Sequence, residues 1–84
     1  MAVALEALTA SAPSVLLLIP AYNEEGSLRE LHAELQGQLT ALGRSFEILY
    51  VDDGSTDRTP QVLAELAAAD PHVRVHRQRR NSGK

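Results

Sequence analysis

Three clusters of polar side chains in this 84-residue sequence could bind a charged ligand. Tyr22 and Glu24 lie in the first, Asp52 and Asp53 form the second, and the third is a basic run that ends at Lys84. Carboxylates only accept hydrogen bonds, so these acids suit a ligand with N–H or O–H donors, such as the edge of uracil or guanine and the hydroxyls of ribose. Cations suit a phosphate, and the ring of Tyr22 could stack on a base or a sugar. The residue types fit a nucleotide, although a polar turn and the acid-rich first turn of a helix would carry the same acids.

The net charge of −3 conceals a strong asymmetry along the chain. All eleven acids lie within residues 1–73, whereas residues 74–84 carry five of the eight basic residues. Such a basic end indicates either a solvated tail or a surface that binds phosphate. One alternative function is therefore a module that binds nucleic acid or another anionic ligand, but the overall acidity and the lack of aromatic residues among the cations disfavour nucleic acid. A non-catalytic α/β interaction module is the other alternative.

Hydrophobic patterns predict three strands. Residues 14–19 are almost entirely apolar, which is typical of a strand buried on both faces, and Pro20 ends the run. Residues 46–51 are rich in aromatic and β-branched side chains and are followed by residues that favour turns. A third, shorter run covers residues 73–76.

Two predicted helices separate these strands. Five leucines of the first recur at spacings of three and four and therefore share one face: Leu28, Leu31, Leu35, Leu39 and Leu42. Ser27 and Glu30 have the spacing of a capping box, and Gly43 is placed for a left-handed residue after the helix. Thr59 and Pro60 predict the N-cap and the first position of the second helix.

The order strand, helix, strand, helix, strand predicts an α/β fold with a parallel sheet and right-handed crossovers. Ligands of such open sheets bind outside the carboxyl ends of the strands. Three segments follow the strand ends in this sequence: 20–27, 52–57 and 79–84. Because each polar cluster lies in one of them, we expect the three clusters to meet at one edge of the sheet.

Several common sites are excluded by the sequence. The chain has no cysteine, which removes disulfides, thiolate metal ligands and cysteine nucleophiles. No Gly-x-Gly-x-x-Gly follows the first strand, position 78 is Gln where a P-loop needs Gly, and the three histidines lack metal-ligand spacing. No apolar run approaches the ~20 residues of a membrane-spanning helix. We assign no catalytic residue and no metal ligand to this chain.

Three motifs resemble the successive amino-terminal motifs of the family 2 glycosyltransferases. They are P-A-Y-N-E-E at 20–25, V-D-D-G-S-T-D at 51–57 and R-N-S-G-K at 80–84. Within that family they are most similar to the dolichyl- and polyprenyl-phosphate sugar transferases, the group of dolichol-phosphate mannosyltransferase. The resemblance covers about residues 14–84 and implies the amino-terminal, nucleotide-binding half of a Rossmann-like GT-A fold.

The resemblance also implies the residues of a nucleotide-sugar site. They are Pro20, Tyr22, Glu24, Val51, Asp52, Asp53 and Lys84. Asp53 would bind the base with Val51 beside it, and Asp52 would support the turn or contact the ribose. Lys84, together with Arg80, would lie toward the diphosphate.

The Asp-x-Asp metal motif of the family does not occur in this sequence, because Asp52 and Asp53 are adjacent and Gly54 follows them. We therefore expect residues 14–84 to be a partial domain, truncated before that motif, and residues 1–13 to be a poorly ordered leader. Mg²⁺ or Mn²⁺ is expected in the full-length protein, with ligands outside this chain. The chain alone is expected to be inactive and to dimerise or aggregate.

The reaction that the resemblance implies transfers a sugar from a nucleoside-diphosphate sugar to a lipid phosphate. The donor would be a UDP-sugar or GDP-mannose, and the acceptor a polyprenyl phosphate, a dolichyl phosphate or a related compound. The sugar, the base and the acceptor stay open. The expected location is cytoplasmic, with the full-length protein at the cytoplasmic face of a membrane.

Overall fold

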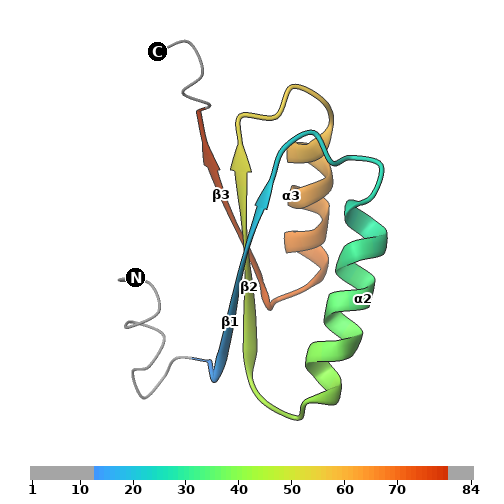
Figure 1. The fold of residues 1–84 in the computed structure, drawn as a ribbon, viewed down its shortest axis with the longest axis vertical. Helices are drawn as coiled ribbons and strands as arrows, with labels where there is room; N and C mark the ends of the chain where they lie inside the picture. The colour runs from blue at the N-terminus through green and yellow to red at the C-terminus, as the bar shows by residue number, and fades with distance from the viewer. Residues whose placement is uncertain (1–12, 80–84) are drawn as a thin grey trace.

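The computed structural model describes residues 13–79, which form a three-stranded parallel sheet and two helices (Figure 1). The elements in chain order are β1 (Val15–Ala21), α2 (Leu28–Ala41), β2 (Phe46–Asp53), α3 (Thr59–Ala69) and β3 (Val73–Gln78). The sheet order is β1-β2-β3, with both neighbouring pairs parallel. The predicted β-α-β-α-β order and parallel sheet are confirmed. The expectations for residues 1–12 and 80–84 lie outside the described residues.

Each strand runs two residues further than the sequence predicts. β1 continues through Pro20 to Ala21, because β1 lies at one edge of the described sheet, where the missing N–H of proline is tolerated. β2 continues through Asp52, which is paired with Ala21 of β1 and Arg77 of β3, to Asp53, which is paired with Gln78 of β3. The end of β2 therefore carries acidic residues directly.

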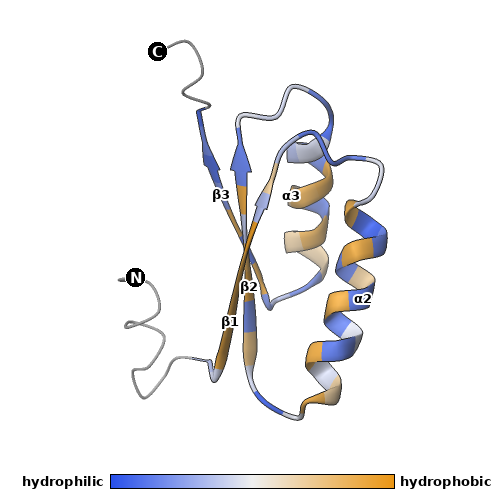
Figure 2. Cartoon of the chain, viewed as in Figure 1, coloured by the Kyte–Doolittle hydropathy of each residue, from blue (hydrophilic) through white to orange (hydrophobic). Residues whose placement is uncertain are grey.

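Both helices cover the same face of the sheet (Figure 1). β2 alternates strictly: Phe46, Ile48 and Tyr50 are buried beneath the helices, whereas Leu49 and Val51 point to the other face and are half-buried. The buried hydrophobic core has eight members: Leu28, Leu39, Phe46, Ile48, Tyr50, Val62, Leu63 and Val73. Apolar residues run along most of β1 and recur at intervals on both helices (Figure 2).

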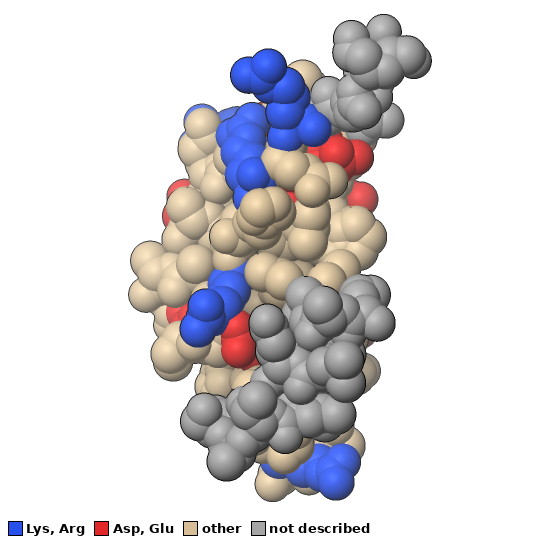
Figure 3. Space-filling model, turned by 90° about the vertical axis from the view of Figure 1, so that its left-hand side faces the viewer, with Lys and Arg blue, Asp and Glu red and all other residues tan. Residues whose placement is uncertain are grey.

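The opposite face of the sheet is not covered by any described element. The prediction that the first strand is buried on both faces is therefore wrong for this part of the chain, and Leu18 is 41% exposed. Both crossovers place their helices on one side, so the apolar side chains of the other side are half-buried or exposed. Figure 3 looks onto this face and shows basic side chains gathered near the end where the strands finish.

The two helix starts agree only in part with their predicted caps. Ser27 is the N-cap of α2, but its hydroxyl contacts Glu24 instead of closing a capping box with Glu30. Arg58, not Thr59, is the N-cap of α3, because the Thr59 hydroxyl is used in a contact between loops. The prediction for Gly43 is confirmed: it follows α2 with φ +71°.

A network of hydrogen-bonded polar side chains connects the helical layer to the sheet. His32 of α2 bonds through Nδ1 to the Tyr50 hydroxyl at 2.8 Å and through Nε2 to Asp70 Oδ2 at 2.9 Å. Asp70 Oδ1 contacts His72 Nδ1 at 2.8 Å, and the His72 ring stacks on Phe46. The sequence predicted no role for His32 or His72, because the partners of each lie on other elements.

Candidate functional site

The loop after β1 and the loop after β2 lie side by side at the carboxyl ends of the strands (Figure 1). Asn23 forms the first part of their contact. Its N–H donates to Ser55 Oγ at 3.0 Å, and its Oδ1 accepts from the N–H groups of Thr56 at 2.8 Å and Asp57 at 3.3 Å. Asn23 has φ +52°, a left-handed conformation that asparagine tolerates better than most residues.

Glu24 and Glu25 form the second part of the contact. The N–H of Glu24 donates to Thr59 Oγ1 at 2.8 Å, and the Glu25 carboxylate accepts from the N–H of Arg58 at 2.8 Å. The Glu25 N–H donates to Asp57 at 3.3 Å. Partial desolvation opposes ionisation of Asp57, but hydrogen bonds from Thr59 and Glu25 outweigh it and lower its pKa. We call these contacts, together with those of Asn23, the loop clamp.

Asp52 organises the turn that follows β2. Its side chain is fully buried, and Oδ1 accepts from the Ser55 N–H at 3.1 Å and the Ser55 hydroxyl at 2.6 Å. Gly54, with φ +70°, provides the left-handed residue that the tight turn requires. Of the two roles open for Asp52, support of the turn and contact with a ribose, these hydrogen bonds favour the first.

The structure brings most of the predicted site residues to one end of the sheet. Pro20 and Val51 are neighbours in register, and Asp53 lies two residues beyond Val51 on the same, uncovered face. Tyr22 and Glu24 are exposed in the first loop. Lys84 and Arg80 lie outside the described residues.

Several residues of this end were not predicted as part of a site. Asn23, Ser55 and Thr59 hold the two loops together, and Arg77 lies against the turn after β2. Asn23 could have been predicted as a turn residue from its position at a strand end, because asparagine is enriched in left-handed turns. The basic run 74–84 included Arg77, but no local signal identified its partners, which are more than twenty residues away.

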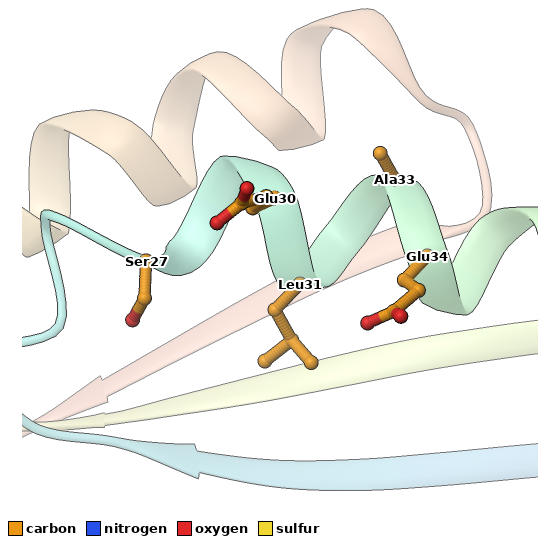
Figure 4. A pocket seen from close by; sticks show the side chains of 5 residues that line it. All are labelled: Ser27, Glu30, Leu31, Ala33 and Glu34. Atoms are coloured by element: carbon orange, nitrogen blue, oxygen red, sulfur yellow. The ribbon is translucent and has the colours of Figure 1, made fainter.

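A hollow of about 590 Å³ lies beside the turn after β2. Its lining residues come from the turn and from the end of β3: Gly54, Ser55, Thr56, Arg77, Gln78 and Arg79. A larger hollow of about 700 Å³ lies along α2 (Figure 4). The smaller hollow suits an anion better, because arginines line it, whereas the larger has Glu30 and Glu34 in its lining.

Two of the basic residues near the end of the chain are already paired with acids. Arg74 forms an ion pair with Glu47 across the uncovered face, and Arg77 lies 3.6 Å from Asp52. This pairing reduces the positive charge that residues 74–79 offer to nucleic acid and weakens the nucleic-acid alternative.

Within residues 13–79 there is no group of three or more His, Asp or Glu side chains that could hold a metal ion. The Asp52 and Asp53 side chains point to opposite faces of the sheet, as neighbours on a strand must. Of the helices in the described region, neither is long and apolar enough to cross a membrane.

Replacing Asn23 tests the loop clamp. We expect Asn23→Gly to lower the free energy of unfolding by about 1–2 kcal/mol, because two backbone donors lose their acceptor while glycine still adopts the positive φ. Asn23→Ala should cost about 1 kcal/mol more, from backbone strain. Denaturant unfolding measures both variants. A neutral or stabilising Asn23→Gly would mean that the side-chain contacts contribute nothing.

The fold and the site together define a class of protein. A parallel β-α-β-α-β sheet with cross-linked polar loops at its strand ends has the form of the amino-terminal part of a GT-A fold. Residues 16–84 match the family described as Glycosyl transferase family 2, and the chain belongs to that family.

Similar proteins include named lipid-phosphate transferases. Over 56 residues the chain is 48% identical to an undecaprenyl-phosphate 4-deoxy-4-formamido-L-arabinose transferase of Pseudomonas paraeruginosa. These 56 residues are 67% of this chain and 16% of that protein. A protein of the same name from Klebsiella pneumoniae is 43% identical over 70 residues, or 82% of this chain and 21% of that protein. The glycosyltransferase YkcC of Bacillus subtilis is 34% identical over 67 residues, or 80% of this chain and 21% of that protein. The chain spans about a fifth of the length of these relatives.

Proposed function

We propose that this chain is the nucleotide-sugar-binding segment of a longer glycosyltransferase that transfers a sugar to a polyprenyl phosphate, a dolichyl phosphate or a related acceptor. The observation that carries the proposal is the meeting of two acid-bearing loops, joined by the loop clamp, with an arginine-lined hollow at the carboxyl ends of the strands. We infer the lipid-phosphate acceptor from the names of the relatives, which are undecaprenyl-phosphate sugar transferases.

The residue chemistry supports a nucleoside diphosphate as the anchor of the donor. Asp53 and Glu24 supply acceptors for the N–H groups of a base or the hydroxyls of a ribose, and Tyr22 is exposed enough to stack on either. Arg79 lines the hollow beside the turn, and its guanidinium would neutralise phosphate oxygens of a donor bound there. UDP-sugars and GDP-mannose both present this set of groups.

In the proposed reaction, an oxygen of the lipid phosphate attacks the anomeric carbon of the donor sugar. The bond from that carbon to the diphosphate breaks, and the electron pair leaves with the nucleoside diphosphate. The acceptor is already ionised at neutral pH, so the step needs no strong general base. The described residues bind and orient the donor, and we assign them no catalytic group.

We propose a bound divalent cation only for the longer protein. Mg²⁺ or Mn²⁺ would neutralise the leaving diphosphate, with ligands outside the described residues. Because the acceptor is a lipid, we also propose that the longer protein works at the cytoplasmic face of a membrane. The isolated chain is proposed to be inactive and prone to dimerise or aggregate.

Donor titration of the full-length protein that carries this chain tests the proposal. We expect binding of at least one UDP-sugar or of GDP-mannose in isothermal titration calorimetry with Mg²⁺ or Mn²⁺ present. Asp53→Ala should weaken it by about 1.5–3 kcal/mol, because a hydrogen bond to a charged group is lost. Glu30→Ala, which removes an exposed acid of α2, is the matched control and should leave the affinity unchanged. The proposal fails if the full-length protein binds none of these donors.

A further inference from the structure

One oxygen of the buried Asp52 carboxylate is not satisfied by a hydrogen bond. The side chain is 1% exposed, and both hydrogen bonds from Ser55 go to Oδ1. Within the described residues, Oδ2 has no hydrogen-bond partner and faces the guanidinium of Arg77, with Nε 3.6 Å away. A buried carboxylate is costly unless a charge or hydrogen bonds compensate it, and the Arg77 guanidinium is the cation that faces this oxygen.

Arg77 contacts both ends of the turn. β2 and β3 place Asp52 and Arg77 opposite each other in register, on the face beneath the helices. From there Nη2 of Arg77 donates to the carbonyl oxygen of Ser55 at 3.3 Å. The planar, forked guanidinium can serve the carboxylate and the carbonyl together, which a lysine ammonium does less well.

The contacts of Arg77 continue into the loop after β1. Ser55 donates its hydroxyl to Asp52 and accepts the N–H of Asn23 on the same oxygen. A line of contacts therefore runs from Arg77 through Asp52 and Ser55 to Asn23 and joins the ends of all three strands. The Arg77 side chain is also 56% exposed and lines the hollow beside the turn.

We propose that Arg77 is a positioning residue for donor binding: its guanidinium holds the Asp52–Ser55 turn, and through it the loop clamp, in the conformation that receives the nucleoside diphosphate. This inference rests on the proposed function for its effect on the donor. Its effect on the turn is independent of that function.

The test combines hydrogen exchange with donor titration in the full-length protein. In Arg77→Gln, we expect amide exchange of a peptide covering residues 54–58 to become about tenfold faster, because a charge-assisted contact to the turn is lost. Exchange of a peptide covering residues 46–51 should not change. Donor Kd should rise by about tenfold, and Arg77→Lys should recover part of the loss.

Two controls separate positioning from charge and from general destabilisation. Arg79→Gln removes the same charge from the same hollow and should leave exchange at residues 54–58 unchanged. In an Asp52→Asn background no buried charge needs compensation, so adding Arg77→Gln should change that exchange by less than about twofold. This double variant also keeps the test valid if Arg77→Gln alone unfolds the protein.

The proposal is overturned by unchanged exchange at residues 54–58 in Arg77→Gln, by an equal change in Arg79→Gln, or by an equal change at residues 46–51. Failure of the proposed function has a different signature. If the proposed function fails, the wild-type protein binds no nucleotide sugar, but faster exchange in Arg77→Gln still shows that Arg77 holds the turn.

Discussion

Asp70→Ala is expected to lower the free energy of unfolding by about 3 kcal/mol or more. The side chain of Asp70 is 6% exposed and accepts from the N–H of His72 at 3.0 Å as well as contacting both imidazole rings. Alanine would leave Nε2 of His32 buried without a partner, since the other ring nitrogen is bonded to Tyr50. Loss of the carboxylate therefore breaks the contact between α2 and the end of α3 and leaves a polar group unsatisfied.

Denaturant unfolding of the chain, at protein concentrations too low for association, measures this loss against two controls. Asp70→Asn keeps an acceptor for the His72 N–H and should cost clearly less than Asp70→Ala. Glu65→Ala removes an acid whose ion pair with Arg29 is exposed, so it should cost less than about 1 kcal/mol. If Asp70→Ala costs no more than Glu65→Ala, the hydrogen-bond network of His32, Tyr50 and Asp70 does not stabilise the fold.

The pH dependence of unfolding provides a further check on Asp70. Burial opposes its ionisation, but hydrogen bonds from His72 and His32 prevail and hold its pKa below the usual 3.8. A lowered folded pKa means that the stabilisation is present above about pH 4 and is lost as the pH falls through the folded value. The difference between wild type and Asp70→Ala should therefore shrink in acid. Burial, and then the charge of Asp70, raise the pKa of Tyr50 above 10.0, so its contribution is lost in strong alkali instead.

Ile48→Ala is expected to cost about 2–5 kcal/mol in the free energy of unfolding. Ile48 is fully buried in the central strand, between β1 and β3 and beneath the helices, so truncation leaves a cavity that the surrounding strands cannot fill. Leu49→Ala is the matched control, because it removes an apolar side chain of similar size from the next position on the uncovered face. It should cost markedly less in this chain. Equal losses for the two variants would mean that both faces of β2 are buried in solution.

Local sequence patterns were sufficient to predict the helices and strands themselves. The apolar runs, the spacing of the leucines in α2 and the left-handed Gly43 depend on residues close together in the sequence, and each was predicted without knowledge of tertiary contacts. Parallel pairing followed from the element order, which placed the acids of the two loops at one edge of the sheet.

Contacts between distant residues could not be predicted in this way. The Thr59 hydroxyl binds the Glu24 N–H instead of capping its own helix, and His32 bonds to Asp70, thirty-eight residues away. Among residues 13–79, helices cover the apolar β1 on one face only. Propensity and periodicity describe how a segment interacts with itself, whereas a hydrogen-bond partner is selected by which elements pack together. The amino-acid sequence by itself therefore determined the order of elements, the parallel sheet and the edge at which the acids gather. Only the tertiary structure decided which side chains hold that edge together, because Asn23 contacts Ser55, and Arg77 contacts Asp52, only once the three strands are in register.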